Sequence, residues 1–113
     1  MKKIEAIIKP SKLEAIKEGL IDADIPSMTI SEVKGCGKQK GFREIYRGTE
    51  FKLNLLNKIK LECVVSDINL EKVIEIIIDK AYTGEIGDGK IFVYDVADAV
   101  RIRTKERGAN AIK

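Results

Sequence analysis

The fold can be inferred outward from the segment Lys58-Ile59-Lys60-Leu61-Glu62-Cys63-Val64-Val65. Apolar and charged side chains alternate along it, as they do in a β-strand with one buried face. The alternation places Cys63 on the same face as Ile59, Leu61 and Val65, so this cysteine is expected to be a small core residue.

A helix and another strand follow in the sequence. Ser66 and Asp67 offer side-chain oxygens for the N-terminus of the helix, and Gly84 fits the left-handed position beyond its C-terminus. Residues 90–96 then read as a strand. The apolar residues at helical spacing are Leu70, Val73, Ile74, Ile77 and Ala81.

The first half of the chain repeats this order. Residues 3–9 alternate as a half-buried strand, the helix that follows has Leu13, Ile16 and Leu20 on one stripe, and residues 28–34 read as the next strand. Ser11 and Glu14 form a capping-box pattern at the start of the helix. Strand–helix–strand therefore occurs twice in one domain, residues 1–113. This predicts an α+β, ferredoxin-like βαββαβ fold, with an antiparallel four-stranded sheet and both helices on one face.

A long polar loop of about residues 36–53 joins the two halves, and it follows Gly35. Loops of this length inside a compact domain are uncommon and usually functional or disordered. Its glycines would let backbone N–H groups approach a ligand closely. An ordinary flexible hairpin tip is the alternative.

The last part of the chain predicts a short C-terminal strand. Arg101 and Arg103 alternate there with Val100 and Ile102, so both arginines are expected on one side of it. Residues 105–113 are charged and contain glycine, and a flexible tail is expected. An exposed sheet face or edge on so small a domain favours oligomerisation.

Composition excludes several classes of site. The 113 residues include two cysteines and no histidine, so neither a CxxC pair nor a Cys/His zinc site is possible. The net charge of +3 is too small to indicate nucleic-acid binding. No signal peptide or transmembrane run is present, and a soluble, intracellular protein is expected.

Three separate stretches offer phosphate-binding chemistry: residues 35–41, residues 83–90, and Arg101 with Arg103. Glycine N–H groups, Lys90 and two guanidinium groups could together bind several phosphate oxygens. Each stretch alone is weak evidence for phosphate binding, since a pair of glycines can simply form a turn and two arginines can simply lie on a solvated face. Together they favour an anionic ligand.

Two other functions compete with this interpretation. For an enzyme, the commonest general base is missing, and Ile91 stands where a Walker motif needs a hydroxyl. An RNA-binding module needs aromatic side chains on its outer strands. Residues 58–65 have none, while Phe92 and Tyr94 share a face expected to supply core.

The chain is similar to the PII nitrogen-regulatory proteins over almost its whole length. Residues 2–10, 37–41, 46–51 and 101–104 carry the likeness, and residues 83–93 form its most specific motif. The resemblance implies a homotrimeric signal protein, not an enzyme, that binds ATP or ADP in three clefts between subunits. A nucleotide-binding enzyme with slow ATP hydrolysis is the alternative. Residues that match the family's nucleotide site are Ile7, Thr29, Gly35, Gly37, Lys38, Gln39, Val64, Gly87, Asp88, Gly89, Lys90, Arg101 and Arg103.

The resemblance also implies Mg²⁺ and 2-oxoglutarate as ligands. Gln39 is expected to bind the Mg²⁺ that bridges ATP and 2-oxoglutarate, while Lys58 pairs with a carboxylate of the effector. The implied 2-oxoglutarate site comprises Gln39, Lys40, Gly41, Lys58 and Gly87.

The long loop matches the family's T-loop, which binds target proteins. Candidate targets are an ammonium transporter, through which alone the protein would meet a membrane, N-acetylglutamate kinase and other nitrogen-metabolism proteins. The cytoplasm or an algal plastid stroma would suit such a protein, and no direct contact with nucleic acid is expected. The implied contact residues are Phe42, Arg43, Glu44, Tyr46, Arg47, Gly48, Thr49, Glu50 and Phe51.

Three positions depart from the family's pattern. Lys38 replaces the more usual arginine and keeps the charge without the forked geometry. Phe51 replaces a tyrosine that many bacterial members carry in a uridylylated or adenylylated form, and it has no hydroxyl to modify. Thr49 stands where cyanobacterial members carry a phosphorylated serine, so its hydroxyl is a possible modification site.

Overall fold

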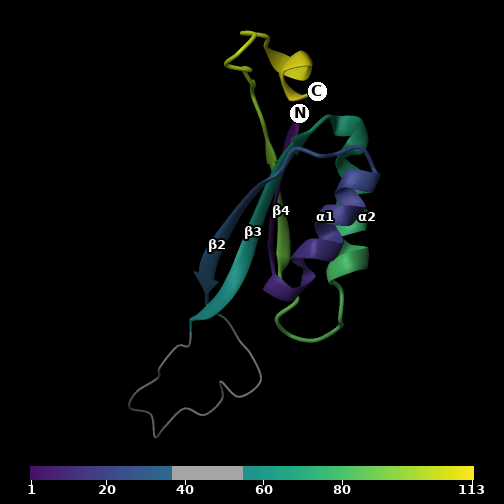
Figure 1. Ribbon diagram of the computed structural model, residues 1–113, viewed down its shortest axis with the longest axis vertical. Coiled ribbons are helices and arrows are strands. Elements are labelled where there is room, and N and C mark those ends of the chain that lie inside the picture. Colours follow the sequence, from purple (N-terminus) through teal and green to yellow (C-terminus); the bar gives the residue numbers. More distant parts are fainter. Residues whose placement is uncertain (37–54) are drawn as a thin grey trace, which may run out of the picture.

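The computed structural model describes residues 1–36 and 55–113. Within these ranges, the strands β1 (Lys2–Ile8), β2 (Thr29–Gly35), β3 (Leu56–Val65) and β4 (Lys90–Asp95) form one sheet in the order β2-β3-β1-β4. All neighbouring strands are antiparallel. The helices α1 (Leu13–Asp22) and α2 (Leu70–Ala81) lie on the same face of the sheet (Figure 1). This is the predicted ferredoxin-like βαββαβ fold.

The core lies between the sheet and the two helices, where the alternation of the strands predicts it. Cys63 is 4% exposed, shares the buried face of β3 with Ile59, Leu61 and Val65, and is a free thiol. The helices contribute the expected stripes, and Leu13 and Leu70 pack at the margin of the core. The buried apolar residues contributed by β1 and the helices are Ile4, Ala6, Ile8, Ile16, Leu20, Val73, Ile77 and Ala81.

The predicted side-chain caps do not form at either helix. Each helix follows a turn of 3-10 helix, η1 (Pro10–Lys12) or η2 (Asp67–Asn69), and neither N-cap makes a side-chain hydrogen bond. Backbone carbonyls take that role, since Lys12 N donates to Lys9 O and Asn69 N to Ser66 O, both at 3.0 Å. The capping-box prediction for Ser11 and Glu14 is therefore wrong, because Ser11 lies inside the 3-10 turn and not at the boundary of α1.

Within residues 1–36 and 55–113, no helix covers the other face of the sheet (Figure 1). Phe92 and Tyr94 lie on it, 44% and 46% exposed, so the prediction that their face supplies core is wrong. The reason is register: Tyr94 pairs with Lys3, which faces away from the helices, and β4 turns Ile91 toward the core instead. The Lys3 ammonium lies 4.9 Å from the centre of the Tyr94 ring.

The chain beyond β4 folds into a small hairpin, not the predicted short strand. Val100 makes only an isolated bridge with Arg107, and residues 102–104 form a turn. Lys105 N donates to Arg101 O at 2.7 Å, and Lys105 adopts a φ of 66°, so the chain reverses there. Residues of the expected flexible tail form the 3-10 helix η3 (Gly108–Ile112).

None of the helices in the described part of the chain is long and apolar enough to span a membrane.

Candidate functional site

The segment between α2 and β4, residues 83–89, is here called the glycine loop. Gly84, Gly87 and Gly89 have φ angles of 89°, 107° and 101°, a region that L-residues with side chains rarely adopt. Gly84 was predicted to occupy the left-handed position directly after α2. The C-cap, Tyr82, is already extended, so Gly84 lies two residues beyond it and belongs to the loop.

Asp88 ties the two ends of the glycine loop together. Its Oδ2 accepts hydrogen bonds from the backbone N–H groups of Thr83 and Gly84 at 2.8 and 2.9 Å, and its Oδ1 accepts one from Thr83 Oγ1 at 2.5 Å. These bonds, the Thr83 hydroxyl first among them, hold the pKa of the carboxyl well below its usual range. Asp88 therefore remains ionised in the folded protein at neutral pH.

Two lysines fasten the loop to the sheet. Lys9, directly after β1, places Nζ 3.3 Å from Asp88 Oδ1. Lys58, near the start of β3, donates from Nζ to the Gly87 carbonyl oxygen at 3.0 Å. At Gly89 the backbone approaches β1 so closely that a Cβ atom would lie 1.8 Å from the Ile7 carbonyl oxygen. Only glycine fits at this contact.

A cavity of about 630 Å³ opens beside the loop and is here called the glycine-loop cavity. Backbone of the glycine loop forms one wall, Lys58 and Lys90 bring positive charge, and Glu85 and Asp88 bring negative charge. This combination of exposed backbone and ammonium groups suits an anion such as a phosphate. The predicted ligand-binding residues that line it are Ile7, Gly35, Lys58, Gly87, Asp88, Gly89 and Lys90.

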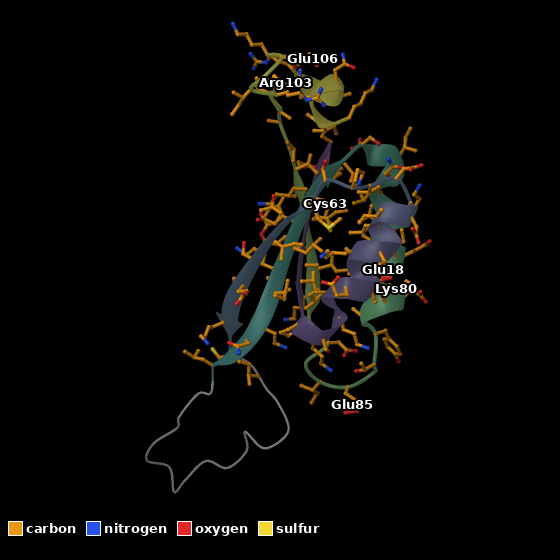
Figure 2. The ribbon with its side chains drawn as sticks, viewed as in Figure 1. Glu18, Cys63, Lys80, Glu85, Arg103 and Glu106 are labelled. Atoms are coloured by element: carbon orange, nitrogen blue, oxygen red, sulfur yellow. The ribbon has the colours of Figure 1, made fainter. Side chains whose placement is uncertain are left out.

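Arg101 and Arg103 belong to the C-terminal hairpin, at the end of the molecule opposite the glycine loop. Asp98 accepts hydrogen bonds from Arg107, including one from Nε at 2.9 Å, and these hold the pKa of its carboxyl below the usual range. Arg101 donates from Nη2 to the main-chain oxygen of Lys113 at 2.6 Å and lies 3.3 Å from Glu106 Oε1 through Nη1. Figure 2 shows Arg103 and Glu106 in this hairpin and Glu85 in the glycine loop at the opposite end.

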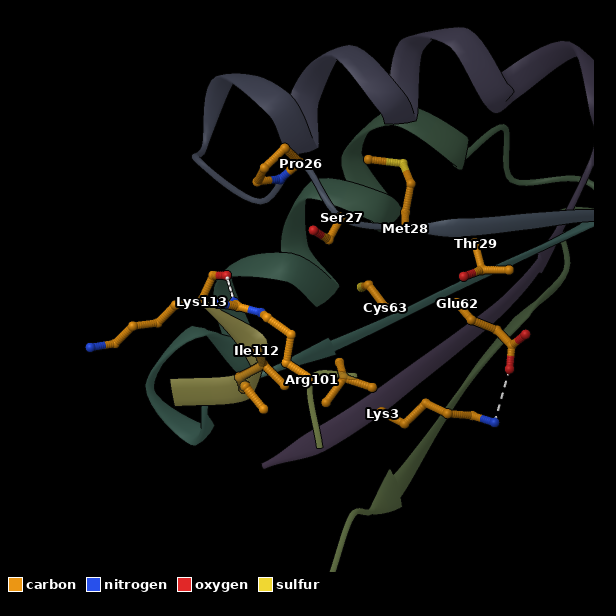
Figure 3. A pocket seen from close by; sticks show the side chains of 12 residues that line it. Lys3, Pro26, Ser27, Met28, Thr29, Glu62, Cys63, Arg101, Ile112 and Lys113 are labelled. Atoms are coloured by element: carbon orange, nitrogen blue, oxygen red, sulfur yellow. Dashed lines mark hydrogen bonds and ion pairs between the residues drawn. The ribbon is translucent and has the colours of Figure 1, made fainter. Parts of the chain in front are cut away.

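A second cavity, of about 740 Å³, lies between this hairpin and the sheet and is here called the tail cavity (Figure 3). Three predicted nucleotide-binding residues line it: Thr29, Val64 and Arg101. Arg103 lies outside both cavities and is exposed, because the turn at residues 102–104 separates it from Arg101.

Sequence reasoning did not select two charged residues of the tail cavity, Lys3 and Glu62. Lys3 Nζ lies 2.9 Å from Glu62 Oε2; the hydrogen bond lowers the pKa of the Glu62 carboxyl and raises that of the Lys3 ammonium. Strand alternation carries the signal for Glu62, since it must share a face with Val64. The role of Lys9 has no such signal, because it depends on how β1 meets the glycine loop.

The structure does not bring the predicted nucleotide-binding residues together within one chain. On β3, Lys58 at one cavity and Val64 at the other are six residues apart, and Gly35 and Thr29 are six apart on β2. At roughly 3.3 Å per strand residue, the two groups lie about 20 Å apart. Each chain thus carries predicted ligand-binding residues in two cavities at opposite ends of its sheet. Predicted residues 37–54, which include Gly37, Lys38, Gln39, Lys40, Gly41 and the T-loop contacts, lie outside the described residues.

Comparison with known proteins assigns the family. The model of the family described as "Nitrogen regulatory protein P-II" matches residues 1–106. Proteins named "Nitrogen regulatory protein P-II" are similar along their whole length: those of Haemophilus influenzae and Pasteurella multocida are 56% and 54% identical over 112 residues, 99% of this chain and 100% of theirs. "Nitrogen regulatory protein P-II 1" of Escherichia coli is 53% identical over the same span. This chain therefore belongs to the P-II family of nitrogen regulatory signal proteins.

Proposed function

We propose that the protein is a homotrimeric sensor that binds ATP and ADP in competition at three equivalent clefts between subunits. Binding of 2-oxoglutarate with Mg²⁺ and ATP then changes its T-loop. The conformation of the T-loop controls which nitrogen-metabolism proteins it binds.

The observation that carries this proposal is the division of the predicted ligands between two cavities at opposite ends of the sheet. Gly87, Gly89 and Lys90 line one, and Thr29 and Arg101 line the other. Because these groups are about 20 Å apart in a single chain, one nucleotide reaches both only where one subunit's glycine-loop cavity faces the tail cavity of the next. A head-to-tail contact of this kind closes into a ring, which a trimer satisfies.

The chemistry of the two cavities fits the two ends of a nucleotide. The glycine-loop cavity offers main chain and the ammonium groups of Lys58 and Lys90, which suits phosphates. The tail cavity offers the methyl groups of Val64 and Thr29 and the carboxylate of Glu62, which suit a base, and the guanidinium group of Arg101, which suits a phosphate. Each nucleotide would thus be held by residues of two subunits.

The proposal that 2-oxoglutarate is the effector, and the choice of partner proteins, rest on the family resemblance. Gln39 would bind Mg²⁺ through its amide oxygen, and Lys58, at the glycine-loop cavity, would receive a carboxylate of 2-oxoglutarate. Within the chain, Lys58 Nζ donates one hydrogen bond to the Gly87 carbonyl oxygen, and an ammonium group has two further N–H donors for a carboxylate. Ammonium transporter, N-acetylglutamate kinase and other nitrogen-metabolism proteins are the proposed targets, met in the cytoplasm or a plastid stroma.

Sedimentation combined with titration calorimetry tests the proposal. We expect a trimer that binds three ATP or three ADP, each displacing the other. A monomer that binds no nucleotide contradicts it. Turnover separates a sensor from an enzyme, since an ATPase in its main function would hydrolyse ATP at roughly 1 s⁻¹ or faster. We expect far slower hydrolysis.

A further inference from the structure

The carboxylate of Asp88 places a negative charge in the wall of the glycine-loop cavity, whose other charged side chains are Lys58, Lys90 and Glu85. Toward a phosphate it acts as a repelling charge. Its presence therefore needs a reason other than the charge of the ligand, and its hydrogen bonds supply one.

Every acceptor position of this carboxylate is in use within the chain. A carboxylate has about four lone-pair sites. Oδ2 accepts from Thr83 N and Gly84 N, while Oδ1 accepts from Thr83 Oγ1 and lies 3.3 Å from Lys9 Nζ. A ligand hydroxyl or a metal ion could reach Asp88 only by replacing one of these partners.

The same bonds fix the shape of the cavity wall. They join Thr83 and Gly84, the first two residues of the glycine loop, to Asp88. Gly87 and Gly89, on either side of Asp88, have φ angles that residues with side chains rarely adopt. Lys58 holds Gly87 from the sheet, and Lys9 neutralises Asp88 from the end of β1. The loop is thus closed by one side chain and tied to β1 and β3.

We propose that Asp88 is a positioning residue: its carboxylate holds the glycine loop in its ligand-binding shape through Thr83, Gly84 and Lys9, and this carboxylate does not itself contact the ligand. The role in binding rests on the proposed nucleotide-binding function, whereas the role in loop shape does not. The family resemblance instead implies that Asp88 contacts the nucleotide. A positioning role and a direct contact lead to different predictions.

Hydrogen exchange of the ligand-free protein tests the loop shape. We expect the Thr83 and Gly84 amides of the wild type to be protected, and Asp88→Asn to raise their exchange at least tenfold, since asparagine keeps one acceptor oxygen and loses the other. The control is Asp79→Asn, which makes the same chemical change at an exposed carboxylate on α2. Unprotected amides in the wild type, or no change in Asp88→Asn, overturn the proposal.

The sign of the effect on nucleotide affinity separates positioning from simple electrostatics. Removing a negative charge beside bound phosphates would tighten ADP binding if charge alone mattered. Positioning predicts the opposite: calorimetry should show Asp88→Asn weakening ADP binding about tenfold, with the affinity of Asp79→Asn unchanged. Thr83→Val should resemble Asp88→Asn, and Thr83→Ser, which keeps the hydroxyl, should bind as the wild type does. Unchanged or tighter binding by Asp88→Asn contradicts the inference.

A double-mutant cycle separates positioning from direct contact. If Asp88 acts through Thr83, then Thr83→Val combined with Asp88→Asn binds ADP no worse than Asp88→Asn alone. If Asp88 instead binds a ribose hydroxyl, the loss caused by a 2′- or 3′-deoxy nucleotide disappears in Asp88→Asn, and the proposal is overturned. A wild type that binds no ADP at all defeats the proposed function instead, and the exchange experiment still decides the role of Asp88 in the loop.

Discussion

A Cβ atom on Gly89 would meet the Ile7 carbonyl oxygen at 1.8 Å, and the backbone there has a φ of 101°. Both facts follow from the antiparallel contact between β1 and β4, where the chain enters β4 directly from the glycine loop. At this residue the conformational freedom of glycine and the absence of a side chain are both required.

Gly89→Ala is therefore expected to lower the free energy of unfolding by more than about 2 kcal/mol, from backbone strain and displacement of β1. Gly108→Ala is the matched control. The φ of 67° at this position is also unfavourable for alanine, but no atom lies within 4 Å of the added Cβ. It should cost only about 1 kcal/mol. Urea titrations at one protein concentration measure both, and equal losses would contradict the steric explanation.

Cys63 carries a prediction about alkaline pH. Burial raises the pKa of its thiol from 9.0 to about 11. The folded state thus keeps a proton that the unfolded state loses between these values, so stability is retained below pH 9 and falls as the pH rises toward 11. At about 1.4 kcal/mol per pKa unit, the full loss above pH 11 is about 3 kcal/mol.

Cys63→Val, which cannot ionise, should remove most of this alkaline loss. Lysines such as Lys2 and Lys3, whose pKa values are raised by carboxylate partners, titrate near this range in both proteins. The comparison of urea midpoints from pH 8 to 11 therefore isolates the thiol. Parallel pH profiles for the two proteins would show that Cys63 does not contribute.

At the scale of elements, α2 shows how one helix separates core from surface. Ile77 and Ile78 are neighbours in sequence, yet Ile77 is 1% exposed between the sheet and α1 and Ile78 is 51% exposed. The 100° step between helical residues places them on different sides. Packing against the sheet, and not helix propensity, therefore decides which of the two isoleucines contributes more to the free energy of unfolding.

Ile77→Ala should destabilise the protein by about 2–5 kcal/mol because it leaves a cavity in the core. Ile78→Ala removes the same atoms from a partly exposed site and should cost about 1 kcal/mol or less. Thermal and urea unfolding of both variants test this. A similar loss in the two would mean that Ile78 is buried in the assembled protein, which would itself locate a subunit contact.

At the scale of the whole molecule, the separation of the two cavities leads to a complementation test. Lys90→Ala damages the glycine-loop half of a site, and Arg101→Ala removes a predicted ligand from the tail cavity, where a charge-assisted bond is worth about 1.5–3 kcal/mol. Each variant alone should bind ATP at least tenfold more weakly.

When the two variants are unfolded together and refolded as mixed trimers, about one quarter of the sites pair two intact halves in an equimolar mixture. That fraction should bind ATP with wild-type affinity, which calorimetry detects as a substoichiometric tight phase. Separately refolded variants mixed afterwards are the control. If no tight phase appears, both halves of the site belong to the same subunit.

The T-loop adds the prediction that couples the ligands. Gln39→Ala should abolish 2-oxoglutarate binding in the presence of Mg²⁺ and ATP, while ADP binding stays nearly unchanged, because glutamine supplies a neutral oxygen to the metal. By linkage, wild-type ATP affinity must rise when 2-oxoglutarate is present, and this rise should vanish in the variant. Calorimetry with each ligand pair measures both effects. Normal 2-oxoglutarate binding by Gln39→Ala contradicts this mechanism.

Local sequence patterns predict the four strands of the sheet, the two helices and their buried faces. Alternation in β3 places Cys63 beside Leu61, and helical spacing selects Val73 and Ile77, because these patterns express the 2.0 and 3.6 residue periods of the backbone. The tertiary structure alone decided what depends on contacts between distant segments. The hairpin that separates Arg101 from Arg103, the pairing of Lys9 with Asp88, and the exposed face of Phe92 each arise where strands and loops meet. Local sequence patterns do not predict these contacts, since strand register and chain reversal are set by packing between segments far apart in the sequence.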